Sequence, residues 1–245
     1  MQAGFGMTYG PVEIAKSLIS ENNLNMNLIE VCANNGFEGS RSIFGIGADN
    51  FDINMIKAGA KRSVEDAKLL IEKGANNFDS CLLIACNRNN IEMVKLMIES
   101  GATNFNDGLI EACKGSHVEL IKLMIEKGAT SFNRGLFALC DYGFLKNMYV
   151  TIELAKLLIE NGANDFNGGL IEACKGDKVE IVKLMIENGA NDFNGGLIEA
   201  CKGGKVEIVK LMIENGATNL NYALYKLPPR HDPNITKLLI EKGAN

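Results

Sequence analysis

The hydrophobic and polar positions of this chain recur with a fixed period. A Gly-Ala dipeptide marks each period, and its glycines are Gly47, Gly74, Gly101, Gly128, Gly162, Gly189, Gly216 and Gly243. Successive spacings are 27, 27, 27, 34, 27, 27 and 27 residues, so a single seven-residue insertion interrupts the period. Because a short fixed period is the signature of a repeat architecture, the chain is predicted to be an array of about eight similar structural repeats.

The best-preserved period, residues 189–215, predicts two helices. The first is expected to follow Asn194 as its N-cap and to end at Gly203 in the left-handed C-cap conformation. Apolar residues spaced three and four apart form one face of this helix, and they are Leu197, Ile198, Ala200 and Cys201. The second helix begins near Lys205 and is apolar around most of its circumference, so it needs neighbours on both sides.

Stacking of these helix pairs is expected on energetic grounds. Ordering one 27-residue repeat costs about 30–50 kcal/mol of conformational entropy. A lone helix pair cannot offset this cost, because most of its Ile, Leu, Met and Phe side chains stay in water. Interfaces between successive repeats must therefore stabilise the chain. The predicted fold is an all-α helix-turn-helix solenoid with short loops and without a single central core.

Two residue types occupy one position in almost every repeat. A phenylalanine row is predicted to be buried, and it comprises Phe51, Phe78, Phe105, Phe132, Phe166 and Phe193. A cysteine row comprises Cys32, Cys86, Cys113, Cys140, Cys174 and Cys201. Neighbouring helices pack about 8–10 Å apart, too far for disulfides, so the cysteine row is interpreted as inert packing thiols. Cys81 lies outside the row and is predicted to be the most reactive thiol.

In its more faithful repeats the chain resembles the second half of the ankyrin repeat. The segments KGSHVELIKLMIEKGA (residues 114–129) and KGGKVEIVKLMIENGA (202–217) are similar to the family's Gly-His pair, its I-V-x-L-L stretch and its closing Gly-Ala. The family repeat has about 33 residues, whereas these have 27, and the missing residues lie where the family's β-hairpin projects. The resemblance implies that His117 is a buried histidine that ties loops together.

The same resemblance implies a function. Ankyrin-like arrays are non-catalytic protein–protein interaction scaffolds that bind through the concave surface of their first helices. This chain is similar to the short-repeat arrays of giant DNA viruses and protists, which implies a host or viral cytosolic protein as partner. The expected location is therefore the cytoplasm, that of a host included, and the odd number of seven cysteines fits a reducing compartment.

The array divides into three parts by sequence. Residues 1–46 are expected to be degenerate N-terminal repeats that open on the half-repeat at Val12 and carry Gly39 inside a helix. Residues 47–220 form the regular repeats, with the insertion near 143–149. Residues 221–245 are expected to be a capping repeat whose first helix ends near Leu227, before Pro228. His231 in this last part is interpreted as a solvated loop residue.

A candidate contact surface follows from variation between the repeats. The outward positions of the first helices differ in the earlier repeats, whereas the later ones repeat a glycine and a Glu-Lys pair. The insertion adds aromatic residues and Met, which are typical of interface centres. The predicted partner-binding residues are Ile53, Lys57, Ser80, Ile84, Asn87, Asp107, Glu111, Lys114, Arg134, Asp141, Tyr142, Phe144, Met148 and Tyr149.

Composition narrows the function further. The net charge of −5 and the absence of a basic stripe oppose nucleic-acid binding. No apolar stretch is long enough to span a membrane. No catalytic, cofactor-binding or metal-ligating residues are predicted, so the chain is not expected to be an enzyme. A monomer is expected, with end-to-end self-assembly into a structural array as the alternative; small-molecule binding in the concave groove is less well supported.

Overall fold

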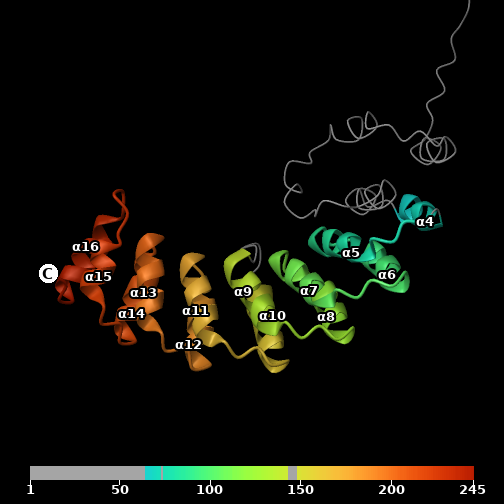
Figure 1. Cartoon of the computed structure of the whole chain (residues 1–245). Helices are drawn as coiled ribbons and strands as arrows, with labels where there is room; N and C mark the ends of the chain where they lie inside the picture. Colours follow the sequence, from blue (N-terminus) through green and yellow to red (C-terminus); the bar gives the residue numbers. More distant parts are fainter. Residues whose placement is uncertain (1–63, 73, 143–147) are drawn as a thin grey trace, which may run out of the picture. The chain divides into compact units, whose positions relative to one another are not determined.

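The computed structural model describes residues 64–72, 74–142 and 148–245, and every regular element in these ranges is an α-helix (Figure 1). The chain forms two compact units, Met1–Asn104 and Phe105–Asn245. The all-α prediction is therefore correct for the described residues. The predictions for residues 1–46, including Val12 and Gly39, lie outside them, as do Ile53, Lys57 and Phe144.

The helices follow the predicted order of pairs. In the first unit the described helices are α4 (Val64–Glu72), α5 (Phe78–Asn87) and α6 (Ile91–Glu99). In the second unit they are α7 (Phe105–Lys114), α8 (Val118–Glu126), α9 (Phe132–Tyr142), α10 (Met148–Glu160), α11 (Phe166–Lys175), α12 (Val179–Glu187), α13 (Phe193–Lys202), α14 (Val206–Glu214), α15 (Leu220–Tyr225) and α16 (Pro233–Glu241).

The second unit is a stack of helix pairs. Its first helices α7, α9, α11, α13 and α15 pack on one another in sequence order, and the second helices α10, α12, α14 and α16 do the same. Each first helix also packs on the second helix of its own pair. Within this unit, successive pairs thus cover one another's apolar residues, as the predicted solenoid requires.

The cysteine row lies in the core of this stack. Cys113, Cys140, Cys174 and Cys201 have no exposed surface, and their thiols are free. Burial raises the pKa of Cys140, Cys174 and Cys201 to about 12, so these thiols stay protonated at neutral pH. The interpretation of the row as inert packing residues is correct for its described members.

A second row of small residues explains how closely the first helices approach. A methyl group on Gly196 would lie 3.2 Å from Cys174 Sγ of the preceding repeat and 2.6 Å from Met212 Sδ of its own repeat. Cys81 occupies the equivalent position of α5 and has no exposed surface. The prediction that Cys81 is the most reactive thiol is therefore wrong, because this position faces a neighbouring helix.

The phenylalanine row is only half-buried, which corrects the prediction of a buried row. Each described phenylalanine of this row is the first residue of its helix. The rings of Phe78 and Phe132 lie near Gly101 and Gly162 of the following loops. This position at a helix start leaves the rings partly exposed.

The helix ends differ from the prediction by one or two residues. Asp192, and not Asn194, caps α13, because its carboxylate accepts a hydrogen bond from Gly195 N at 2.9 Å. Gly203 has a right-handed φ of −83°, and the left-handed residue is Gly204, with φ of 70°. The left-handed residue therefore lies one position later than predicted, at Gly204.

Asn194 has another structural role. Its side-chain oxygen accepts hydrogen bonds from Thr218 N and Asn219 N of the next repeat, at 2.8 and 2.9 Å. The equivalent residue of the other described pairs makes the same kind of contact with the following loop, and these residues are Asp79, Asn106, Asn133, Asn167 and Asn221. We call these six residues the asparagine row. It links successive repeats within each unit by polar contacts.

No helix among the described residues combines the length and the apolar character that crossing a membrane requires.

Candidate interaction surface

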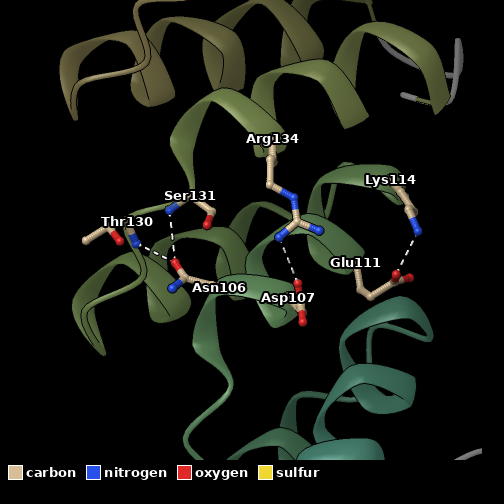
Figure 2. A network of polar contacts seen from close by, with 7 residues as sticks. All are labelled: Asn106, Asp107, Glu111, Lys114, Thr130, Ser131 and Arg134. Carbon is tan, nitrogen blue, oxygen red and sulfur yellow. Dashed lines mark hydrogen bonds and ion pairs between the residues drawn. The ribbon is translucent and has the colours of Figure 1, made fainter. Parts of the chain in front are cut away.

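The outward face of α7 and α9 in the second unit carries a network of charged side chains (Figure 2). Arg134 Nη1 lies 3.1 Å from Asp107 Oδ1, which joins α9 to α7 across the repeat boundary. On α7, Lys114 Nζ donates to Glu111 Oε1 at 2.7 Å. Asn106 lies on the same helix and accepts from the backbone N–H groups of Thr130 and Ser131 (Figure 2). The structure thus places four of the predicted contact residues together.

Similar ion pairs continue along the first helices. Glu172 and Lys175 of α11 lie 2.8 Å apart, and Glu199 and Lys202 of α13 lie 2.6 Å apart. The hydrogen bond that Lys175 donates to Glu172 raises the pKa of Lys175, so this lysine stays charged at neutral pH. The second helices carry comparable exposed pairs, for example Glu180 and Lys183 of α12. Ion pairs alone therefore do not distinguish the two faces of the stack.

The glycines that precede the Glu-Lys pairs of α11 and α13 are explained by the local structure of the helix start. Gly168 and Gly195 are the third residues of α11 and α13, where the N-cap carboxylates of Asp165 and Asp192 fold back onto their backbone N–H groups. A methyl group at Gly195 would lie 2.5 Å from the Asp192 carboxylate. The outward positions of these two repeats are therefore adapted to helix capping.

Ile84 is not part of the accessible surface. Only 7% of this residue is exposed, so its prediction as an outward contact residue is wrong. The same position holds Glu111 and Glu199 in other repeats, and their side chains are only 15% and 22% exposed. Since the position lies at the edge of the helix–helix contact, a long side chain reaches solvent from it, whereas isoleucine is covered. Ser80 on the same helix is half-buried, and Asn87 is exposed.

The predicted residues around the insertion lie at two helix ends. Tyr142 is the last residue of α9, and Met148 and Tyr149 are the first two residues of α10. Tyr149 is 71% exposed, and Met148 is half-buried. Asp141, one residue before the end of α9, is also exposed.

A buried lysine, which was not identified from the sequence, binds the C-terminal end of α9. Lys178 is 3% exposed, and its ammonium donates to the backbone oxygens of Leu139 and Asp141, at 3.0 and 3.2 Å. Burial lowers the pKa of Lys178. The contact satisfies two carbonyl groups in the last turn of α9, where carbonyl groups lack intrahelical donors. A lysine after a Gly-Asp turn gave no signal of this role in the sequence.

The last helix pair carries an exposed aromatic cluster that was also missed. Tyr222 and Tyr225 of α15 are 43% and 78% exposed, and their ring centroids lie 6.4 Å apart. Lys226 Nζ lies 5.1 Å and 5.3 Å from the two ring centroids. Two tyrosines three residues apart in a short helix were the available signal. The sequence analysis assigned this repeat to capping alone.

The two histidines lie in loops between helices. His231 is half-buried, its Nδ1 lies 2.8 Å from Pro228 O, and its Nε2 lies 2.6 Å from Thr236 Oγ1. It therefore holds the loop between α15 and α16, which corrects its interpretation as a solvated residue. His117 is half-buried and precedes α8, so the burial implied by the family resemblance is only partial. No group of three or more potential metal ligands occurs among the described residues.

Comparisons with known proteins agree with the stacked helix pairs of this structure. A family model described as "Ankyrin repeats (3 copies)" matches residues 55–134 and 145–221. Among solved structures 101 chains match, including the crystal structure of the human ASB11 ankyrin repeat domain. That domain has 19% sequence identity and a TM-score of 0.56, and the match covers 78% of this chain and 98% of that one. This likeness shows the fold alone. Comparison with curated proteins gave no match.

Proposed function

This chain belongs to the ankyrin repeat family, and from this premise we propose that it is a non-catalytic protein–protein interaction scaffold. Ankyrin repeats generally act as protein–protein interaction modules. The proposed binding surface of the second unit is the outward face of its first helices, with Asp107, Glu111, Lys114 and Arg134 at its centre. Asp141, Tyr142, Met148 and Tyr149 extend it. In the first unit, Ser80 and Asn87 are the proposed contacts.

One observation carries this proposal. The residues that stabilise the stack repeat almost unchanged, whereas the equivalent outward residues vary. The third residue of α7, α9, α11, α13 and α15 is Asp107, Arg134, Gly168, Gly195 and Tyr222 in turn. Stacking does not demand such variety, because these side chains lie off the core. A varied surface on a uniform scaffold is how repeat proteins acquire a site shaped for one partner.

The scale of the surface fits a protein partner. A stable interface needs about 800 Å² from each side. Packed first helices lie about 8–10 Å apart, so several successive helices present the width that such an interface covers. The ion pairs on these helices can exchange their partners for charged groups of a bound protein at small cost, since exposed pairs contribute only about 0–1 kcal/mol each.

The proposal also includes the location of the protein and the origin of its partner. We place the protein in the cytoplasm, because Cys113, Cys140, Cys174 and Cys201 are buried free thiols, as is usual for a reducing compartment. A host or viral cytosolic protein is the proposed partner, and the basis is the resemblance to short-repeat viral arrays.

The test compares two charge-reversed variants of the full chain. One reverses Lys114, Arg134 and Lys175 on the first helices to Glu, and the matched control reverses Lys156, Lys183 and Lys210 on the second helices to Glu. Both change the net charge equally, and all six side chains reach solvent. We expect the first variant to lose at least about tenfold in partner captured from cytosol, measured by quantitative mass spectrometry, because it reverses charges at the proposed site.

The control variant is expected to capture the same proteins as the unmodified chain. Equal capture by both variants, or a loss confined to the second-helix variant, would contradict the proposed surface.

A further inference from the structure

We propose that Tyr222, Tyr225 and Lys226 of α15 form a docking site for an acidic segment of the protein partner. We call these three residues the tyrosine cluster. The inference rests on the proposed scaffold function and specifies the chemistry of the partner at one end of the second unit. It also gives the last helix pair a role beyond capping.

The exposure of the cluster is the first argument. Tyr222 and Tyr225 are 43% and 78% exposed, although tyrosine rings usually bury most of their apolar surface. At the equivalent positions of α13 stand Gly195 and the half-buried Ile198. A repeat that served only to end the stack would present a polar outer face. This one presents two large rings.

The two rings occupy different positions in the repeat. Inside the unit, Phe137 lies over the third residue of the next first helix, since a methyl group on Gly168 would lie 2.5 Å from Phe137 Cζ. Tyr225 is the equivalent of Phe137, and it therefore extends over the trailing flank of α15. Tyr222, however, belongs to the outward row that includes Asp107 and Arg134, whose side chains are 42% and 64% exposed although another repeat follows each of them. A following repeat would not bury it.

The geometry of the cluster suits recognition. The two rings are stacked at 6.4 Å with 29° between their planes, and one ammonium lies within 5.3 Å of both. These contacts hold three long side chains in one arrangement, so binding costs less side-chain entropy. Tyrosine offers a rigid apolar ring together with a hydroxyl that donates hydrogen bonds. The ring faces can pack on apolar side chains, while the hydroxyls and the ammonium bind carboxylates.

The positive charge of the last repeat favours an acidic ligand. Residues 220–245 contain four Lys or Arg against two acidic residues, whereas the whole chain has a net charge of −5. Both acidic side chains of this segment are engaged within the last repeat, because Asp232 caps α16 and Glu241 lies 3.8 Å from Lys237. Lys226 replaces the Glu199 of the preceding repeat, which reverses the charge at this position. Opposite charge on the partner segment is therefore favoured.

The experiment measures binding of a defined probe to the full chain. The probe is a fluorescein-labelled peptide of repeated Glu-Glu-Phe-Gly units, and its control is the same peptide with Lys in place of Glu. Fluorescence anisotropy is expected to show binding of the acidic peptide at least about tenfold tighter than of the basic one, with affinity falling as salt is added.

Variants locate the site. Tyr225→Ala and Lys226→Glu are each expected to weaken acidic-peptide binding at least about tenfold, while Val118→Ala, which trims an exposed apolar side chain outside both proposed sites, leaves it unchanged. Lys226→Gln is expected to lie between Lys226→Glu and the unmodified chain. Thermal unfolding of each variant checks that the repeat remains folded, which is expected because Tyr225 is exposed and Lys226 is only half-buried.

Four results would overturn the proposal: no binding of the acidic peptide, equal binding by all variants, tighter binding of an oligothymidylate, and a dimer in sedimentation that Tyr225→Ala abolishes. Partner capture then separates this inference from the scaffold proposal. If capture depends on Lys114, Arg134 and Lys175 but not on Tyr225 or Lys226, the scaffold stands and the docking site fails. If capture depends on neither set, both fail.

Discussion

Single side chains connect the repeats in ways that hydrophobic burial does not. Asn194 accepts two backbone N–H groups of the following loop, at 2.8 and 2.9 Å, and the other members of the asparagine row make similar contacts. The accepting oxygen is common to the row, since Asp79 fills the same place in the first unit with bonds of 2.7 and 2.8 Å. The amide nitrogens of Asn133, Asn167 and Asn221 also donate to the next loop, whereas the contacts of Asn194 use its oxygen.

Substitution at Asn194 tests the role of this oxygen. We expect Asn194→Ala to lower the free energy of unfolding by about 1–2 kcal/mol, because two backbone donors lose their protein acceptor and turn to water. Asn194→Asp should change it by less than about 0.5 kcal/mol, since the carboxylate still accepts both bonds near a helix N-terminus. Urea unfolding measures both values. An aspartate variant as unstable as the alanine variant would refute the acceptor role.

Lys178 gives a pH-dependent prediction. Burial lowers its pKa in the folded state, so above this pKa the unfolded chain binds more protons than the folded one. Stability should therefore rise with pH between the lowered pKa and the ordinary pKa of lysine. In Lys178→Met this contribution is absent, because methionine keeps an apolar stem without a titrating group. Urea unfolding of both proteins from neutral to alkaline pH gives the difference; parallel curves would contradict the prediction.

At the scale of the helices, the close approach of neighbouring first helices limits side-chain size. Gly196 faces Cys174 of the preceding repeat and Met212 of its own second helix, and Gly135 faces Cys113 and Leu158 in the same manner. A small residue at each contact allows the helices to pack closely. The cysteine row and these two glycines thus lie on opposite sides of one helix–helix interface.

Gly196→Ala tests this interface. Alanine favours a helix over glycine by about 1 kcal/mol. We nevertheless expect a net loss of stability of about 1–3 kcal/mol, because the new methyl group would overlap Met212 Sδ. In the double variant with Met212→Ala, the total loss should be smaller than the sum of the two single losses. Additive losses in thermal or urea unfolding would show that the two residues do not share a contact.

At the scale of the whole molecule, stability and recognition use different residues. The stack is stabilised by the buried rows, whereas the proposed surface consists of exposed ion pairs such as Asp107–Arg134, whose side chains are 42% and 64% exposed. The variant with Lys114, Arg134 and Lys175 changed to Glu is therefore expected to lose no more than about 1 kcal/mol per pair in free energy of unfolding. A collapse of the fold in circular dichroism would mean that these residues are structural.

Several features followed from the sequence alone. The 27-residue period, the two helices of each repeat and the buried cysteine row were all predicted, because helix periodicity and residue size act over a few residues. The Glu-Lys pairs of the first helices were predicted for the same reason, since residues three apart share one helix face. These local rules hold together in the repeats of α7, α11 and α13, which carry both the cysteine and the Glu-Lys pair.

Other features depended on how the helices meet. Whether residue 84 reaches solvent is decided by the distance to the neighbouring helix, so Ile84 is buried where glutamate would be partly exposed. Asn194 finds its partners 24 and 25 residues further along the chain, and Lys178 finds its acceptors 39 and 37 residues earlier. The exposure of Tyr222 and Tyr225 likewise follows from their position in the stack. Local sequence thus determined the repeat, and long-range packing determined which of its side chains are available for binding.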